Sequence, residues 1–305
     1  MPQDNKLRIE AKPYLMHNAV QNYAWGTSGE TAFIPKLLGR KAETDVPYAE
    51  LWMGAHPKAP SQIEIDGEYY ALDKLAASHS EAIIGDANAK KFGGFPFLFK
   101  VLAAGESLSI QAHPNKKQAE ALHSRDAEHY PDDNHKPEIA IAISPFQALA
   151  GFKSLTDLSV TFAVYPEIAE FLGETMVQEI HANKDASPEK QKLALKSMYS
   201  HYMQKSESNA QELITAIDAL QLRLQGKMAP FPADALFLEM RMKYPGADVG
   251  LFSIYLLNLL SLQPGEALFM EAGIPHAYVN GNIIECMSNS DNVVRAGLTP
   301  KFQDQ

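Results

Sequence analysis

The sequence predicts a mainly β domain interrupted by a helical insertion, and three observations lead to this prediction. Up to about residue 152, short β-like runs such as residues 97–102 alternate with Gly- and Pro-containing breaks. Between residues 153 and 258, apolar side chains recur mainly at helical spacing. After that region the β pattern returns. We therefore expect one discontinuous β-domain, residues 1–152 and 259–305, and a helical domain at residues 153–258.

Length and composition limit the class of protein. A chain of 305 residues with 46% hydrophobic and 21% charged residues is typical of a folded protein with one large and one smaller domain. The formal net charge of -10 argues against nucleic-acid binding, because phosphate backbones require a basic surface. The single cysteine, Cys286, excludes an intramolecular disulfide and a zinc site built from several thiolates. The first residues show no apolar signal segment, so we expect a cytoplasmic protein without a membrane partner.

The helical part can be divided by its local signals. Ser187 and Pro188 form a helix opening, with serine as the cap and proline at the first helical position. Apolar residues at helical spacing follow over 195–202 and again over 213–224, and residues 233–242 predict another helix. The most apolar stretch, residues 249–262, is short for a bilayer span and is expected to be a buried helix. We expect this domain to pack and shape the molecule rather than to react.

In the returning β region, residues 264–266 predict a turn. Residues 273–275 and 280–282 predict hairpin-type breaks.

Residues 106–114 carry the first candidate metal ligands. Leu108, Ile110 and Ala112 alternate with polar residues, so a strand would place Gln111 and His113 on the same face. A side-chain carbonyl and an imidazole on one face can bind one metal ion. The alternative is an amphipathic strand whose polar face meets water.

Residues 134–143 add a carboxylate. On a strand, the isoleucines would occupy one face, and Glu138 would head the other face, which otherwise holds small alanines. If that face lines the inside of a barrel, the buried Glu138 anion requires a cation. Alternatively, Glu138 lies in solvent or is paired only with Lys136 or Lys100.

Residues 264–278 resemble the second conserved stretch of the cupin fold, a strand, a glycine-containing turn and a Pro-His pair opening the returning strand. His276 and Tyr278 share a face there. With Gln111, His113 and Glu138, His276 completes a set of two imidazole nitrogens and two oxygens that suits zinc, although manganese, cobalt and iron(II) also fit. Because four protein ligands are typical of a closed structural site, catalysis would require the metal to expand its coordination, to retain water or to act electrostatically.

The ordered motifs at residues 21–26, 49–57, 100–114, 133–138, 273–278 and 289–301 resemble type I mannose-6-phosphate isomerases (phosphomannose isomerases), a family of zinc-dependent cupin enzymes. The resemblance implies a mainly β cupin-type (jelly-roll) barrel with an inserted helical domain. It also implies one zinc ion per chain, and interconversion of mannose 6-phosphate and fructose 6-phosphate through a cis-enediol. Members commonly continue into a further C-terminal β-domain, whereas this sequence ends at Gln305.

The resemblance also assigns residues. The zinc ligands correspond to Gln111, His113, Glu138 and His276. The family's active-site arginine corresponds to Arg295, and its cleft residues correspond to Trp25, His56, Lys100, Ser109, Lys136, Tyr278, Glu285, Asp291 and Lys301. We expect a local basic cleft, in which Arg295 assists charge or phosphate and Ser109 donates to the phosphate. Glu285 is the preferred proton-transfer group, with His56 and Lys136 as rivals. Alternatively, Glu285 is only a structural partner of a lysine.

Two other functions remain open at this point. One is a different metal cupin enzyme, such as an iron(II) dioxygenase, which two histidines and a carboxylate would permit. The other is a non-catalytic, metal-stabilised module that binds a sugar phosphate. The expected partner in the isomerase interpretation is a small sugar phosphate, with no nucleic acid or membrane, and the expected state is a monomer.

Overall fold

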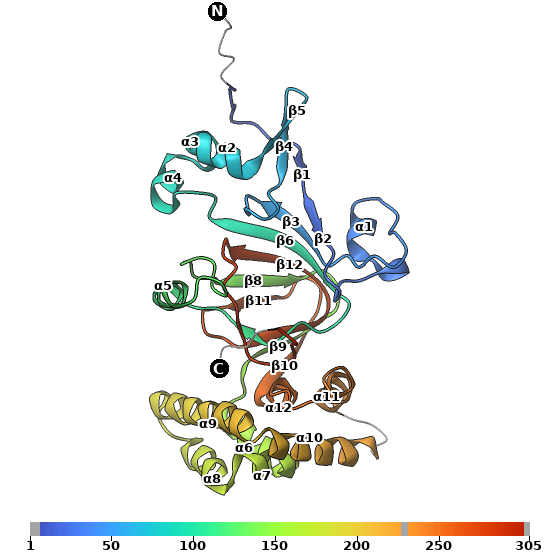
Figure 1. Cartoon of the computed structure of the whole chain (residues 1–305), viewed down its shortest axis with the longest axis vertical. Coiled ribbons are helices and arrows are strands. Elements are labelled where there is room, and N and C mark those ends of the chain that lie inside the picture. The colour runs from blue at the N-terminus through green and yellow to red at the C-terminus, as the bar shows by residue number, and fades with distance from the viewer. Residues whose placement is uncertain (1–6, 227–230, 302–305) are drawn as a thin grey trace, which may run out of the picture.

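The computed structural model describes residues 7–226 and 231–301 and is mainly β with an inserted group of helices, as predicted. A ten-stranded sheet occupies the middle of the molecule (Figure 1), in the order β10-β9-β12-β6-β3-β2, with β7, β8, β11 and β13 attached beside this path. Among the described residues the sheet stays open rather than closing on itself. Its strands are β2 (Ala19–Gln21), β3 (Glu50–Gly54), β6 (Phe97–Ala104), β7 (Gln111–Ala112), β8 (Glu138–Ala142), β9 (Phe146–Phe152), β10 (Leu257–Leu262), β11 (Ala267–Met270), β12 (His276–Ser288) and β13 (Val294–Arg295).

The long strand β12 is the centre of this sheet. Its first half pairs with β9 and β7, and its second half pairs with β6 and β8. The hairpin expected at residues 280–282 is therefore wrong, because the chain passes straight through. Gly281 has φ 104° there, and a Cβ at this position would lie 2.4 Å from the carbonyl oxygen of Pro145. The glycine permits another segment to approach closely instead of reversing the strand.

Two smaller groups of elements flank the sheet. A three-stranded sheet of β1 (Met16–His17), β4 (Gln62–Ile65) and β5 (Glu68–Ala71) lies at one end with α2 (Leu72–Ser78), α3 (Ser80–Ile84) and α4 (Asp86–Phe92), as Figure 1 shows. The remaining short elements are η1 (Gly29–Thr31), α1 (Phe33–Leu37) and α5 (Lys116–Arg125).

The helices gather at the opposite end of the molecule (Figure 1). They are α6 (Leu155–Val164), α7 (Pro166–Leu172), α8 (Glu174–Asn183), α9 (Pro188–Ser208), α10 (Ala210–Gln225), α11 (Pro232–Lys243) and α12 (Gly250–Leu256). The helix α9 begins at the proline that the sequence indicated, but the side chain of Ser187 makes no capping hydrogen bond. The helical core is continuous with the sheet, because Ile110, Leu149 and Ala277 belong to the same buried cluster.

The apolar stretch at residues 249–262 differs from the single buried helix that was expected. It forms the helix α12 and then the strand β10, which pairs with β9. The side chain of Asn258 stabilises this change, since its amide lies within 3.2 Å of the carbonyl oxygens of Ala150, Gly151 and Phe152. Within the described ranges, no helix has the length and apolar character to cross a bilayer.

The seven described helices, α6 to α12, thus form one segment of the chain that follows β9 and ends where β10 begins. The proposed domain limits at residues 152 and 259 stay a prediction, and the ends of the proposed β-domain, 1–6 and 302–305, lie outside the described residues.

Candidate active site and metal centre

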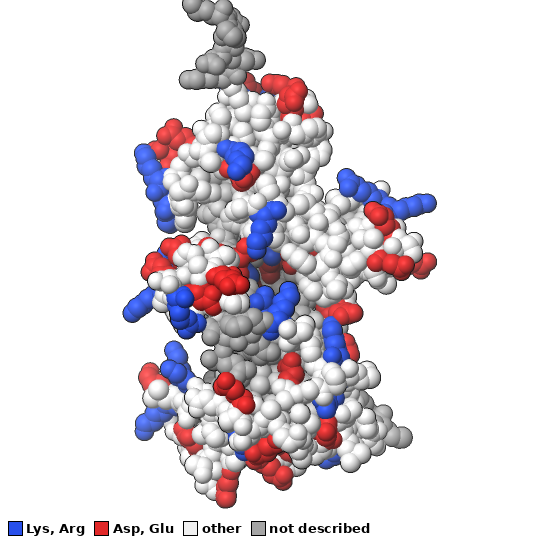
Figure 2. Space-filling view, viewed as in Figure 1, with Lys and Arg blue, Asp and Glu red and all other residues white. Residues whose placement is uncertain are grey.

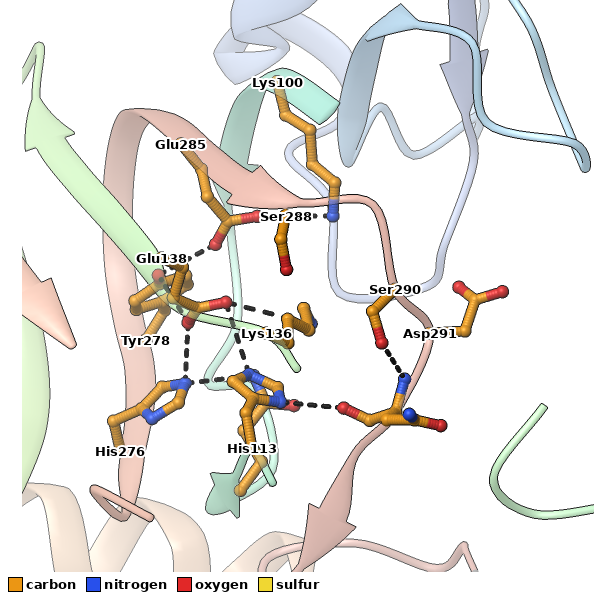
Figure 3. Close-up of polar contacts among 12 residues, drawn as sticks. Lys100, His113, Lys136, Glu138, His276, Tyr278, Glu285, Ser288, Ser290 and Asp291 are labelled. Carbon is orange, nitrogen blue, oxygen red and sulfur yellow. Dashed lines mark hydrogen bonds and ion pairs between the residues drawn. The ribbon is translucent and has the colours of Figure 1, made fainter. Parts of the chain in front are cut away.

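Three buried side chains from three strand ends meet at one point (Figure 3). Glu138 opens β8, His276 opens β12, and His113 directly follows β7. One ligand atom from each lies within 4.8 Å of the others. The Nε2 atoms of His276 and His113 lie 2.8 and 3.3 Å from the two carboxylate oxygens of Glu138. This arrangement depends on the alternation of β8, in which Glu138, Ala140 and Ala142 are buried.

The two imidazoles are oriented by backbone carbonyls. His113 Nδ1 lies 2.9 Å from the carbonyl oxygen of Asn292, and His276 Nδ1 lies 2.9 Å from that of Ile274. Since a carbonyl only accepts, each Nδ1 is assigned the proton, and each neutral ring then presents the lone pair of Nε2 to Glu138. Two lone pairs that face a carboxylate require a cation between them.

A metal ion fits this requirement. Among the described residues, His113 Nε2 is a buried nitrogen without a hydrogen-bond partner. Burial, followed by the charge of Lys136, lowers the pKa of His113 to about 4, so the ring is neutral and able to bind a metal at neutral pH. Nitrogen and carboxylate ligands with carbonyl-oriented rings are typical of zinc sites.

Gln111 lies at the edge of the same group. Its side-chain nitrogen is 3.5 Å from His276 Nε2, in register with His276 across the pairing of β7 and β12. A half-turn of the amide would present its oxygen to the same point. The role of Gln111 as a fourth ligand stays a prediction.

Positive charge compensates the buried Glu138. Burial alone would raise the pKa of this carboxyl, but the contact with His113 and the charge of Lys136 outweigh burial and hold its pKa well below the usual range. The ammonium of Lys136 lies 3.8 Å from the Glu138 carboxylate, and both side chains are almost completely buried. Glu138 is therefore an anion in the folded chain.

A second buried group of charges adjoins the first (Figure 3). Lys100 Nζ lies 3.4 Å from Glu50 and 3.3 Å from Glu285. Burial opposes the charge of Lys100, but Glu50 and Glu285 prevail and raise its pKa. Burial raises the pKa of Glu285 despite the nearby Lys100. The hydroxyl of Tyr278 lies 2.8 Å from Glu285 and 3.2 Å from Glu138, so one phenol connects the two groups.

Glu50, Lys100, Glu285 and Tyr278 line a cleft of about 630 Å³. Figure 2 shows Lys and Arg side chains around a hollow in the middle of the visible face. Of the fourteen predicted site residues, eleven line this cleft: Trp25, His56, Lys100, Ser109, Gln111, Lys136, Tyr278, Glu285, Asp291, Arg295 and Lys301. His113, Glu138 and His276 do not line it. They lie beneath its floor, against Lys136, Gln111 and Tyr278.

One wall of the cleft is formed by paired charges. His56 is buried, and its Nε2 lies 3.3 Å from Asp291 Oδ1, while Lys58 Nζ lies 2.8 Å from Asp291 Oδ2. Burial opposes the charge of Asp291, but His56 and Lys58 outweigh it and lower the pKa of this carboxyl. The backbone N–H of Lys58 donates to His56 Nδ1, which leaves Nε2 to carry the proton towards Asp291.

The cations Arg295 and Lys301 differ from Lys100 and Lys136. In the part of the chain that the structure describes, neither forms an ion pair with a carboxylate. Arg295 lies on β13 and is half-buried, and burial lowers the pKa of its guanidinium. Both side chains can therefore accept an anion in the cleft.

Sequence reasoning missed Glu50 and Asn292. Glu50 was visible as the one charged residue in the apolar run of β3, where its carboxylate accepts from the indole N–H of Trp52. Asn292 acts through its backbone carbonyl on His113, and a backbone atom gives no signal in the sequence.

A buried histidine–carboxylate centre beneath a cationic cleft, built on a mainly β scaffold, places the chain among the metal-binding cupin enzymes. Family models agree and are more specific. The catalytic domain of type I phosphomannose isomerase matches residues 14–155, and its helical insertion domain matches residues 171–257. The chain belongs to the type I phosphomannose isomerase family.

Curated relatives and solved structures support this membership. The mannose-6-phosphate isomerase of Homo sapiens is 42% identical over 300 residues, a match that covers 94% of this chain and 69% of the relative. Mannose-6-phosphate isomerase 2 of Arabidopsis thaliana is 38% identical over 298 residues, covering 93% and 67%. The enzyme of Salmonella typhimurium, solved with fructose 6-phosphate and zinc, is 36% identical with a TM-score of 0.79 and covers 95% of this chain and 72% of its own.

Proposed function

We propose that this chain is a zinc-dependent mannose-6-phosphate isomerase that interconverts mannose 6-phosphate and fructose 6-phosphate. The observation that carries the proposal is the buried group of His113, Glu138 and His276 beneath a cleft lined by Arg295 and Lys301, two cations that pair with no carboxylate among the described residues. This combination suits a small anionic sugar, and it agrees with the family to which the chain belongs.

Gln111, His113, Glu138 and His276 would hold the zinc ion. When bound, zinc supplies a fixed positive charge that polarises sugar oxygens and stabilises an enediolate. The ring nitrogens are prepared for this task, because their Nδ1 atoms are occupied by backbone carbonyls. Lys136 keeps the carboxylate of Glu138 ionised and close to the histidines.

We assign the phosphate to the open side of the cleft. Arg295 and Lys301 supply positive charge there, and the hydroxyl of Ser109 lines the same cleft as a hydrogen-bond donor. Trp25 contributes an apolar wall beside Tyr23, with ring centroids 5.8 Å apart. The paired charges of His56 and Asp291 make a rigid rim that orients sugar hydroxyls.

Glu285 remains our choice for the proton transfer. Its carboxylate would take the proton from C2 of the open-chain sugar while a C1–C2 double bond forms and the C1 oxygen gains a proton. The same group would then return the proton to C1 as the C2 hydroxyl loses its own, and this hydroxyl proton balances the one that the C1 oxygen gained. Burial raises the pKa of Glu285 towards the value that a general base requires, and Lys100 and Tyr278 fix its two oxygens.

His56 and Lys136 are less suited to this step. His56 Nε2 pairs with Asp291, so it is not free to take a proton from the sugar. The ammonium of Lys136 pairs with Glu138 and carries no free lone pair. The remaining parts of the proposal are a monomeric chain, a cytoplasmic location and a role in the carbohydrate metabolism that leads to GDP-mannose.

The test is a coupled assay for fructose 6-phosphate formed from mannose 6-phosphate, before chelation, after chelation and after addition of zinc. The expected result is loss with the chelator and recovery with zinc. Activity that never appears would refute the isomerase, and activity that survives complete metal removal would refute the zinc dependence.

Variants assign the roles. His113→Ala should lose zinc and turnover together, whereas His181→Ala, an exposed helical histidine, should lose neither. Arg295→Ala should keep zinc and lose turnover by on the order of 100-fold, with the exposed Arg40→Ala as its control. Glu285→Gln should abolish exchange of the C2 hydrogen with solvent while the sugar still binds. Retained exchange would reassign the base to His56 or Lys136.

A further inference from the structure

We infer that Asp132 is a positioning residue that joins two loops of the cleft and thereby fixes His113, Lys136 and Asp291. The two loops are residues 132–137, which lead into β8, and residues 289–292, which follow β12. The inference rests on the proposed metal site and function, but its main measurement is zinc affinity rather than activity.

The carboxylate of Asp132 accepts hydrogen bonds from both loops. Its Oδ1 accepts from the backbone N–H of Asn134 at 2.9 Å, from the hydroxyl of Ser290 at 2.8 Å and from the side-chain amide of Asn292 at 3.2 Å. Its Oδ2 accepts from the backbone N–H of Asp291 at 2.8 Å. One side chain therefore gathers four donors, three of them from the loop after β12.

The contact with Asn292 leads directly to the metal centre. The side-chain amide of Asn292 is completely buried and also donates to the carbonyl oxygens of Asp132, at 2.6 Å, and Asn134, at 3.0 Å. These bonds fix the residue, whose own backbone carbonyl accepts from His113 Nδ1. A shift of Asn292 would release the imidazole of His113 from the orientation in which Nε2 faces Glu138.

The same junction places two cleft residues. Asp291, bonded through its backbone to Asp132, carries the carboxylate that pairs with His56 and Lys58. Lys136 lies four positions after Asp132, just before Glu138. In Figure 3, Ser290 and Asp291 lie on one loop, and Lys136 lies between this loop and the pair of Glu138 and His113.

A carboxylate is required at this position, and an isosteric amide cannot replace it. Both oxygens of Asp132 face donors, so the nitrogen of an asparagine would face either the N–H of Asp291 or the donors around Ser290. Within residues 7–226 and 231–301, no lysine, arginine or histidine forms an ion pair with Asp132, so the donors alone balance its charge. Hydrogen bonds to an ionised acceptor are roughly twice as strong as neutral ones.

The neighbouring Asp133 provides a matched control. Its carboxylate is exposed and contacts Lys116, on the outside of the molecule. Asp132→Asn and Asp133→Asn therefore make the same chemical change at adjacent positions, but only the first removes an acceptor from the junction.

The experiment measures the zinc dissociation constant of the folded variants by competition with a chromogenic chelator. Asp132→Asn should weaken zinc binding by about 10- to 100-fold, the usual effect of removing a group that orients a metal ligand. Asp133→Asn should bind zinc as the unchanged chain does. A residue that only stabilises the fold would lower the melting temperature of Asp132→Asn and leave its zinc affinity unchanged, and that result would overturn the inference.

Two further arms keep the test decisive. If Asp132→Asn does not fold, Ser290→Ala removes a single donor from Oδ1 and should still weaken zinc binding several-fold, and unchanged affinity would overturn the inference. At saturating zinc, Asp132→Asn should also lower kcat/KM for mannose 6-phosphate because Lys136 and Asp291 are displaced. If the unchanged chain binds zinc but does not convert this sugar, the proposed function fails while the zinc comparison still decides the role of Asp132. An unchanged chain that binds no zinc would refute both.

Discussion

Replacement of Lys100 by methionine tests whether the buried charges of the cleft depend on one ammonium. Lys100, Glu50 and Glu285 are all less than 10% exposed, and Lys100 Nζ lies within 3.4 Å of both carboxylates. Lys100→Met would remove the ammonium that lies next to both carboxylates and leave only the charge of Lys136 to act on Glu285. Removal of one partner from a buried ion pair costs about 3–5 kcal/mol, and we expect a loss of unfolding free energy in this range.

The measurement is urea unfolding at a fixed free zinc concentration. The double variant Lys100→Met/Glu50→Gln should recover at least half of the loss, because only Glu285 then remains, and its raised pKa favours the neutral form. The control is Lys90→Met, which removes an exposed pair with Asp86 and should cost about 0.5 kcal/mol or less. A loss below about 1 kcal/mol for Lys100→Met, or no recovery in the double variant, would contradict the reasoning.

Two more predictions concern single positions. Gly281→Ala should lower the free energy of unfolding in urea by at least about 2 kcal/mol, because the alanine would combine an unfavourable φ with a backbone overlap. The control, Gly246→Ala, has open space around it and should change this free energy very little. Equal effects of the two substitutions would contradict the account of β12. In the metal-free protein, the pKa of His113 is about 4, below the unfolded value, so its contribution to stability is complete above about pH 6.5 and is lost as the pH falls through 4. This loss of unfolding free energy, about 3 kcal/mol, should be absent from His113→Gln. Identical pH profiles of the unfolding free energy for the unchanged metal-free chain and for His113→Gln would refute this prediction.

Patterns of alternation were sufficient to predict some of the site. The small residues beside Glu138 indicated an inward face of a strand, and the structure buries Glu138, Ala140 and Ala142 as expected. The residue types of the four predicted ligands indicated a zinc-type metal site, and the resemblance to a known family supplied the remaining cleft residues. Strand alternation and residue type can be predicted because a short segment of the sequence shows both by itself.

Other features depended on distant segments and could not be predicted. Asn280, Gly281 and Asn282 have the composition of a turn, but the glycine is needed there because Pro145, in the turn between β8 and β9, approaches the backbone closely. The continuous apolar run around Leu257 fits a helix and a buried strand equally well, and only the pairing with β9 decides between them. The orientation of His113 depends on a carbonyl group 179 positions away.

The position of β12 in the chain has a consequence for biosynthesis. This strand pairs with β6, β7, β8 and β9, all of which leave the ribosome earlier, and it brings His276 to ligands that end at Glu138. At about 5–20 residues per second, translation of the segment between Glu138 and His276 takes roughly 7 to 28 s. During this interval the nascent sheet lacks its central strand, while the helices, with more local contacts, can already pack. Newly made chains are thus most exposed to aggregation and to chaperones shortly before the metal centre can be completed.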